Sequence, residues 1–183
     1  MSATRRAAAT ALVAAALLLA GPVAAGAAGH TGGPSAVQQG LAAARATTAS
    51  LHSTASAIDA GYLPPAPGSV LDACITLPDA GMGVHYVNGM IFDGIPDAAQ
   101  PESLVYEPTA NGRLRLVAVE YLVLRSAWDA EHDAPPMLLG HEMHLTVIPT
   151  LPEFYALHAW IWKHNPDGMF ADFNPNVSCE HFG

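Results

Sequence analysis

The sequence predicts an α+β domain in which one N-terminal amphipathic helix is followed by about five mostly antiparallel strands. Two observations lead to this prediction. An alanine-rich segment has apolar residues at every third or fourth position, and after it come several short runs rich in β-branched and aromatic residues. A small closed β-barrel is the alternative arrangement of the same strands.

Residues 1–29 are predicted to be a secretory signal peptide. Arg5 and Arg6 precede a predominantly apolar run of 14 residues, and small residues suited to cleavage follow it. This run is too short to cross the roughly 30 Å hydrocarbon core of a bilayer as a helix, so no stable membrane anchor is expected. Residues 30–36 are predicted to be a flexible lead-in, and 37–183 a single globular domain that is secreted or extracytoplasmic.

The predicted exported part is strongly acidic. The signal peptide contains two of the seven Lys and Arg residues and none of the 16 Asp and Glu residues, which leaves five basic against 16 acidic side chains, a net charge of −11. Nucleic acid and anionic membrane surfaces are bound through clustered Lys and Arg, and the sequence has no basic stripe. Neither is therefore an expected partner.

Cys74 and Cys179 are the two cysteines of the chain, and in an oxidising compartment they are expected to form one disulfide. The bond would tie the end of the chain to an early segment, with a chain-entropy contribution of about 4–5 kcal/mol. Two free thiols are the alternative. Neither cysteine belongs to a C-x-x-C motif, so redox catalysis is not expected.

The helix is expected between Val37 and Ala60, where Thr48 is the one polar residue in an otherwise apolar stripe. A proline-rich connector, residues 62–70, then leads toward Cys74. The strands are expected at residues 81–88, 104–107, 113–124, 143–148 and 155–164, with an Asn111-Gly112 turn between the second and the third. An acidic loop (125–136) and a tail of turns after residue 164, held over the sheet by the disulfide, complete the prediction.

The strand predicted at 113–124 contains a carboxylate among apolar side chains. If Arg113 and Arg115 define its outer face, alternation places Glu120 in the opposite row, together with Leu114, Leu116, Ala118, Leu122 and Leu124. A carboxylate buried there needs a cation, an imidazole, a metal or several hydrogen bonds beside it.

Two histidines are expected near the middle of other strands. His85 follows Gly81 and Gly83, which permit close approach of a neighbouring backbone. In the last strand, Lys163 is expected to face solvent together with Leu157, Ala159 and Ile161, which leaves His158 and Trp160 on the other face.

If His85, Glu120 and His158 converge, they form a site for a divalent metal such as zinc or non-haem iron. Tyr86 and Trp160 are predicted to supply apolar walls for a small ligand beside them. Hydrogen bonds between the three polar side chains are the alternative, because a strand histidine is often a satisfied core residue.

His141, Glu142 and His144 form a second cluster, spaced H-E-x-H. The zinc proteases with an H-E-x-x-H motif need two histidines four apart on a helix, whereas these are three apart beside a predicted strand. The cluster is therefore expected to be a surface feature.

Several segments carry a resemblance to known proteins: GMGVHYVN, PESLVYEP, LRLVAVEYLV and LHAWIWKHNPDGMFADFNPNVSC, with DAGY at the end of the predicted helix. Together they resemble a family of secreted bacterial proteins, of actinobacterial type, that has no assigned activity. The resemblance covers the chain from about Thr47 to Cys179. It implies a single exported domain with a Cys74–Cys179 pairing, and it identifies no catalytic residue.

Three functional interpretations follow from the sequence. The first is a secreted, disulfide-linked domain that binds a small ligand or a divalent metal in the His/Glu/aromatic pocket. The second is a non-catalytic cell-envelope or extracellular interaction protein in which the three polar side chains form a structural network. The third is a cofactor-free enzyme that uses Glu120 as a base. The sequence leaves open whether the protein is an enzyme.

Overall fold

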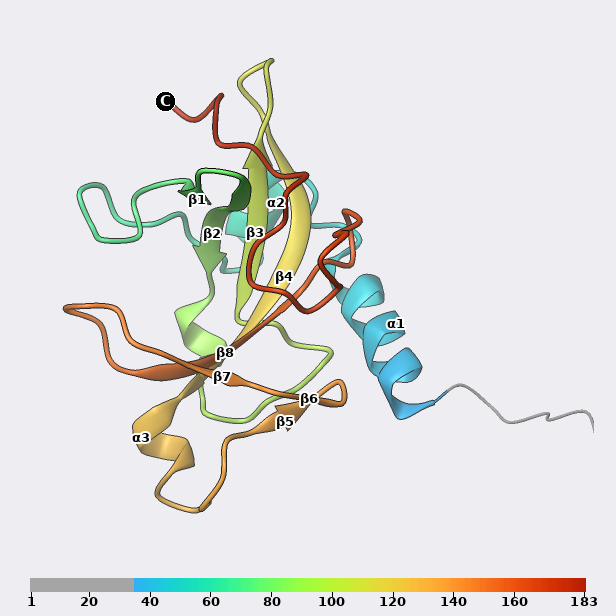
Figure 1. Ribbon diagram of the computed structural model, residues 1–183, viewed down its shortest axis with the longest axis vertical. Helices are drawn as coiled ribbons and strands as arrows, with labels where there is room; N and C mark the ends of the chain where they lie inside the picture. The colour runs from blue at the N-terminus through green and yellow to red at the C-terminus, as the bar shows by residue number, and fades with distance from the viewer. Residues whose placement is uncertain (1–34) are drawn as a thin grey trace, which may run out of the picture. The chain divides into compact units, whose positions relative to one another are not determined.

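A curled antiparallel sheet of six strands, a half-barrel, dominates the computed structural model, which describes residues 35–183 (Figure 1). The strand order is β1-β2-β3-β4-β8-β7. The strands are β1 (Ile75–Leu77), β2 (Ala80–Val87), β3 (Ser103–Pro108), β4 (Leu114–Leu124), β7 (His144–Thr146) and β8 (Phe154–Ala159). A second, two-stranded sheet pairs β5 (Met137–Leu138) with β6 (His141–Glu142). The predicted mixture of helix and antiparallel sheet is confirmed, whereas the predicted signal peptide lies outside the described residues.

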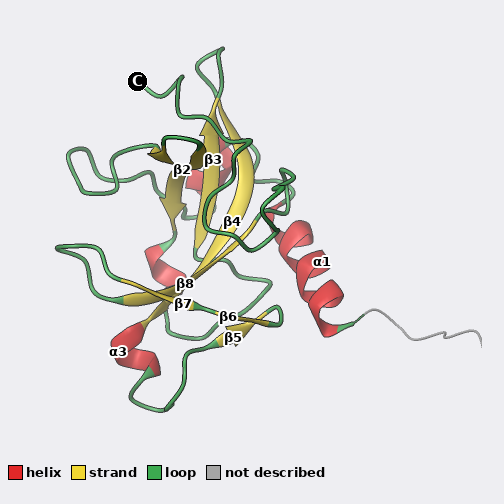
Figure 2. Cartoon of the chain, in the orientation of Figure 1, coloured by secondary structure: helices red, strands yellow, loops and turns green. Residues whose placement is uncertain are grey.

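Two helices, α1 (Ala36–Thr48) and α2 (Thr54–Asp59), occupy the segment predicted as one helix (Figure 2). Ser35 caps the N-terminus of α1 in a capping box. Its hydroxyl accepts a hydrogen bond from the backbone N–H of Gln38, and the Gln38 side-chain oxygen accepts one from the backbone N–H of Ser35. Thr48 ends α1, and its buried hydroxyl donates to the carbonyl of Ala44. Two short helices follow later, η1 (Gly89–Ile91) and α3 (Arg125–Trp128), the second inside the predicted acidic loop.

The strands correspond to the sequence pattern where that pattern is long enough to read. Five strands begin within one or two residues of the predicted starts: β2, β3, β4, β7 and β8. Gly112, with φ +75°, lies in the turn between β3 and β4. β8 ends at Ala159, five residues before the predicted end. β1 has three residues, and β5 and β6 have two each. Strands this short show no periodicity that could be recognised in the sequence.

A β-bulge in β4 changes which side chains share a face. Tyr106 pairs with Leu116 and Val105 pairs with Ala118, so Val117 is the extra residue of the bulge. Leu116 consequently packs in the main core, while Ala118 lies in the small cluster on the other face. The predicted row from Leu114 to Leu124 is therefore wrong in its first half, because the alternation shifts by one residue at the bulge.

The expectation that one face of the last strand meets solvent is also wrong. Leu157 and Ala159 are 2% and 0% exposed and belong to the main core. Lys163 lies beyond the end of β8, where its Nζ donates to the Glu107 carboxylate at 2.6 Å. The reason is that this face packs in the main core, to which α1 and α2 contribute Ala44 and Ala57. The tail after β8 covers the opposite face, where Ala171 and Asp172 lie beside Trp160 and His158.

The tail is fastened at several points. Asn174 forms a β-bridge with Gly81, and the indole of Trp160 donates to the Ala171 carbonyl at 2.6 Å. The Cys74–Cys179 disulfide is present, with a Cα–Cα distance of 5.6 Å across a separation of 105 residues, so the predicted pairing is confirmed. The tail is therefore held against the face of the sheet that carries the polar side chains described next.

Candidate metal centre

Three strands bring His85, Glu120 and His158 together on one face of the sheet. Glu120 on β4 pairs in register with His158 on β8 and with Ser103 on β3. Ser103 in turn pairs with Val87 on β2, two residues from His85 and on the same face. Because the sheet curls and Ser103 is small, the imidazole of His85 reaches across β3 to the carboxylate.

The glycines before His85 allow this approach, as the sequence predicted. A Cβ atom at Gly81 would lie 2.6 Å from the Val177 carbonyl oxygen, and one at Gly83 would lie 2.6 Å from that of Tyr106. Gly83 also has φ +115°, a conformation that residues with a side chain rarely adopt. A side chain at either position would therefore push the strand that carries His85 away from its neighbours.

The three side chains meet at distances that suit ligands around one metal ion. His85 Nε2 lies 3.4 Å from His158 Nε2 and 3.6 Å from Glu120 Oε2, and His158 Nε2 lies 3.6 Å from Glu120 Oε1. Ligand bonds of about 2.0–2.2 Å in tetrahedral geometry place the ligand atoms about 3.3–3.6 Å apart. The distance between the two Nε2 atoms corresponds to such an edge, the two His–Glu distances reach different oxygens of Glu120, and one ligand atom from each residue lies within 4.8 Å of the others.

Hydrogen bonds within the group are few. The two His–Glu separations of 3.6 Å exceed the usual N–H···O range, and only the contact between the imidazoles falls within hydrogen-bonding distance. Among the described residues, three buried side-chain atoms lack a hydrogen-bond partner: His85 Nδ1, His158 Nδ1 and Ser103 Oγ. These three residues share the face of the group, so it is the part of the fold where buried polar atoms are least satisfied.

Burial sets the electrostatics of the group. The side chains of His85, Glu120 and His158 are 6%, 10% and 2% exposed. Burial lowers the pKa of His85, only partly opposed by the negative charge of Glu120. Burial also acts to lower the pKa of His158, but Glu120 and Asp172 more than offset it, so that this pKa is raised. The two imidazoles therefore differ, and the neutral form, whose lone pair can bind a metal, is favoured at His85.

Asp172 in the tail is a fourth member that sequence reasoning missed. Its Oδ1 lies 3.8 Å from His158 Nδ1, a charge interaction rather than a hydrogen bond, and its other oxygen lies 4.0 Å from His144 Nδ1. A carboxylate behind a histidine commonly orients a metal-ligating imidazole. No spacing in the sequence links Asp172 to His158, because the tail reaches this place through turns and the disulfide.

A cavity of about 260 Å³ opens beside the group, lined by His85, Glu120, His158 and Asp172 together with Thr146 and apolar side chains. Tyr86 is not among its lining residues, since alternation along β2 turns it to the main core, where its ring meets that of Tyr106. Trp160 packs behind His158, with 6.1 Å between the ring centroids. The positions of Tyr86 and Trp160 thus lend no support to the ligand-binding role predicted for them.

The second predicted cluster supplies none of the three candidate ligands, and only His144 approaches the group, through its 4.0 Å contact with Asp172. His141, Glu142 and His144 are exposed, as expected for a surface feature, and the ring of His141 packs against Phe170. Within residues 35–183, the only set of three metal-ligating side chains close enough to hold one ion is His85, Glu120 and His158.

Two further findings bear on function. Protein-family models, curated proteins and solved structures were compared with the chain, and none of them matched it. Residues 35–183 contain no helix with the length and apolar character needed to cross a membrane. The Cys74–Cys179 disulfide indicates an oxidising, extracytoplasmic environment.

Proposed function

We propose that the protein binds one divalent transition-metal ion through the Nε2 atoms of His85 and His158 and the carboxylate of Glu120. The observation that carries this proposal is the convergence of ligand atoms from three different strands, which lie within 4.8 Å of one another, with the two Nε2 atoms 3.4 Å apart. Two imidazoles and one carboxylate form a donor set used for zinc and for non-haem iron.

The alternative of a purely structural hydrogen-bond network is less well supported. Such a network should join the three side chains by hydrogen bonds, yet both His–Glu separations are 3.6 Å, longer than the usual N–H···O range, and only the two imidazoles lie within hydrogen-bonding distance of each other. Glu120 also needs compensation for its buried charge, and no Lys or Arg of the part of the chain that the structure describes lines the cavity beside it. A metal ion bound between the three side chains would satisfy this requirement.

Three protein ligands leave a coordination position for water or for a ligand in the 260 Å³ cavity. A metal bound in this way supplies Lewis-acid chemistry, and with iron the same donor set supports oxygen chemistry. Glu120 would then be a ligand, which distinguishes this function from a cofactor-free enzyme in which the same carboxylate is a free base.

Elemental analysis tests the proposal. Protein purified without an affinity tag from its native export route, and incubated with zinc, iron or copper, is expected to contain about one metal ion per chain. The His158→Ala variant should lose it, whereas His181→Ala, which removes an exposed histidine near the end of the chain, should retain it. Folding of both variants is checked by circular dichroism.

Metal content below about a tenth of an equivalent in the folded wild-type protein, whichever of the three metals is added, would overturn the proposal. A metal ion that binds only the folded state should also stabilise the protein. At a free metal concentration of 100 times its Kd, the free energy of unfolding should rise by about 2.7 kcal/mol. This stabilisation should be absent from His158→Ala, which separates specific binding from surface adsorption.

We further propose that the protein is secreted and acquires its metal outside the cytoplasm. The disulfide and the predicted signal peptide support this proposal. Expression of the full chain should yield an extracellular form whose N-terminus begins near residue 30. An uncleaved chain that stays in the cytoplasm would contradict it.

A further inference from the structure

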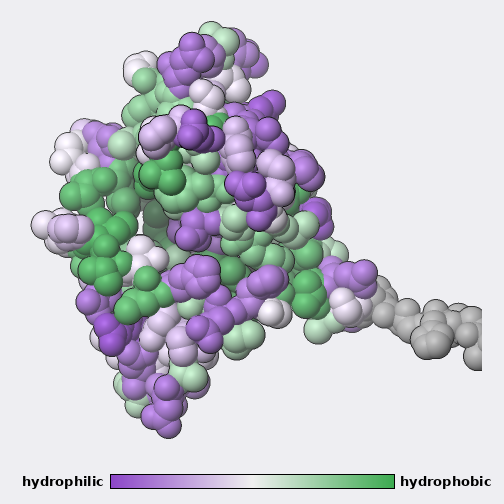
Figure 3. All heavy atoms as spheres, in the orientation of Figure 1, coloured by the Kyte–Doolittle hydropathy of each residue, from purple (hydrophilic) through white to green (hydrophobic). Residues whose placement is uncertain are grey.

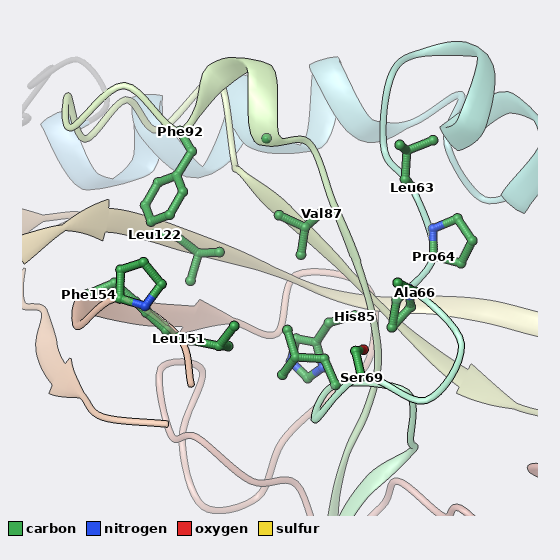
Figure 4. A pocket seen from close by; sticks show the side chains of 14 residues that line it. Leu63, Pro64, Ala66, Ser69, His85, Val87, Phe92, Leu122, Leu151 and Phe154 are labelled. Carbon is green, nitrogen blue, oxygen red and sulfur yellow. The ribbon is translucent and has the colours of Figure 1, made fainter. Parts of the chain in front are cut away.

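A second cavity, of about 370 Å³, adjoins the one beside the metal-binding group. The two cavities share the lining residues Leu71, His85, Val87, Leu122 and Phe154. Since five side chains border both, the spaces meet on one face of the sheet and extend from the polar group toward the proline-rich connector. Figure 4 shows His85 and Val87 between the connector residues on one side and Phe92, Leu122 and Phe154 on the other.

The outer cavity has almost entirely apolar walls. The connector supplies Leu63, Pro64 and neighbouring residues, while Phe92 and Leu151 lie across from them. Among residues 35–183, Ser69 and His85 supply the only polar side chains of its lining, and no Asp, Glu, Lys or Arg of this part of the chain lines it. In Figure 3, apolar residues gather around a hollow on this face of the molecule. The combined space is thus polar at one end and apolar along the rest.

We infer that the two cavities bind one elongated aliphatic molecule that carries a single carboxylate or ester head group. The head group lies at the metal held by His85, Glu120 and His158, and the hydrocarbon chain lies against Leu63 and Leu151. This inference rests on the proposed metal site. Pockets for small ligands have volumes of about 300–1,000 Å³ and mostly apolar walls with a few convergent polar groups, which describes this pair of cavities.

The charges around the space determine how such a ligand binds. No Lys or Arg of the described residues lines either cavity, and the inner one has two carboxylates, Glu120 and Asp172. Without a metal, these carboxylates repel an acidic head group, whereas a divalent ion attracts it. A neutral chain of the same length gains the same apolar burial in both forms of the protein. Dependence on the metal is therefore specific to the head group.

The experiment compares decanoic acid with 1-decanol, each measured by displacement of a neutral fluorescent naphthylamine from zinc-loaded and from chelator-treated protein. Decanoic acid should bind the zinc-loaded form at least about tenfold more tightly, a difference of 1.4 kcal/mol, while decanol should bind both forms about equally. Methyl decanoate, the corresponding ester, tests whether a neutral carbonyl is sufficient as the head group. If it binds the zinc-loaded form more tightly than the chelator-treated form, the carbonyl oxygen is a ligand of the metal.

Wall variants test the position of the hydrocarbon chain. Leu63→Asp places a charge in the outer cavity and should weaken both probes about tenfold, since a buried apolar chain would meet a carboxylate. Leu77→Asp is the matched control, because Leu77 is similarly exposed (51% against 57%) and lines neither cavity. Leu151→Asp, on the opposite wall, provides a second variant should Leu63→Asp fail to fold.

Metal content, measured in the same samples, separates the two proposals. If one zinc ion is bound but neither probe displaces the dye, or if Leu63→Asp and Leu151→Asp bind as tightly as Leu77→Asp, the inference is overturned and the metal site stands. Equal affinity of decanoic acid for the two forms overturns the placement of the head group at the metal. If none of zinc, iron and copper is bound, the metal proposal fails first, and the inference fails with it.

Discussion

Glu120 and His158 pair directly across β4 and β8, and Glu120 Oε1 lies 3.6 Å from His158 Nε2. The other ring nitrogen of His158 lies 3.8 Å from the carboxylate of Asp172 in the tail. The imidazole is therefore placed between two carboxylates, one inside the sheet and one at the edge of the cavity. Its orientation depends on a contact within the sheet and also on a segment that the disulfide holds in place.

Asp172→Asn tests the contribution of the tail to the site. Loss of this charge behind His158 is expected to lower the affinity for zinc about 10- to 100-fold, as for other carboxylates behind a ligating histidine. The fold should be retained, because the Asp172 side chain is 49% exposed. Competition with a chromophoric chelator measures the affinity. Asp79→Asn, which changes another exposed aspartate, should leave it unchanged; equal affinities for the two variants would contradict a positioning role.

Glu102→Gln is expected to remove a pH dependence of stability. Burial raises the pKa of Glu102 from 4.5 to about 8, although its Oε2 accepts a hydrogen bond from the backbone N–H of Leu122. Between these two pH values, the unfolded chain loses a proton that the folded protein keeps, so the free energy of unfolding falls as pH rises from about 4.5 to about 8. Glutamine keeps the acceptor and has no proton to lose.

Urea unfolding between pH 4 and pH 8 measures this effect. The difference in free energy of unfolding between Glu102→Gln and the wild type should shift in favour of the variant by on the order of 3 kcal/mol between pH 4 and pH 8. Glu131→Gln, at an exposed position, is the control and should follow the wild-type curve. Parallel curves for Glu102→Gln and the wild type would show that Glu102 is not protonated in the folded state.

Lys163→Met should destabilise the fold through Glu107. The buried Glu107 carboxylate accepts hydrogen bonds from Lys163 Nζ, from Arg115 and from the backbone N–H of Ser178. Burial acts to raise the pKa of Glu107, but these donors outweigh it and hold the pKa below its usual value. With Lys163 removed, this charge is only partly compensated, and a loss of about 2 kcal/mol in the free energy of unfolding at pH 7 is expected.

Chemical denaturation of Lys163→Met and Arg113→Met at pH 7 provides the measurement, since Arg113 is exposed in the turn between β3 and β4. The ionised Glu107 carboxylate stabilises the fold above the unfolded pKa of 4.5, and this stabilisation is lost as the pH falls through the lower pKa of the folded state. The difference in free energy of unfolding between wild type and Lys163→Met should therefore shrink in acid. Equal stabilities of the two variants at pH 7 would exclude this role for Lys163.

Replacement of both cysteines by serine should lower the free energy of unfolding by about 4 kcal/mol, because the bond closes a loop of roughly 105 residues. The zinc affinity should fall as well, since Asp172 lies in the segment that the bond fastens. Urea unfolding and chelator competition give the two values. A variant with wild-type stability and affinity would show that the other tail contacts, such as the Asn174–Gly81 bridge, suffice.

The sequence by itself determined the class of the fold, the positions of the longer strands and the three residues of the candidate site. Periodicity and β-branched composition are local properties, so β2, β4 and the Asn111-Gly112 turn could be recognised without a structure. Glu120 was recognisable for a similar reason, because a carboxylate within an apolar strand stands out in any register. The predicted signal peptide also depends on local composition and stays a prediction.

The tertiary structure alone decided which side chains share a surface. The bulge at Val117 shifts the alternation of side chains between the two faces of β4, and no residue type in that strand indicates where the bulge lies. The tail covers the second face of the sheet and brings Asp172 to His158, a contact across turns whose path local patterns do not encode. The apolar cavity likewise arises where the connector meets β2 and the segment before β8, far apart in sequence. Contacts of this kind depend on how distant segments pack, and periodicity carries no information about that.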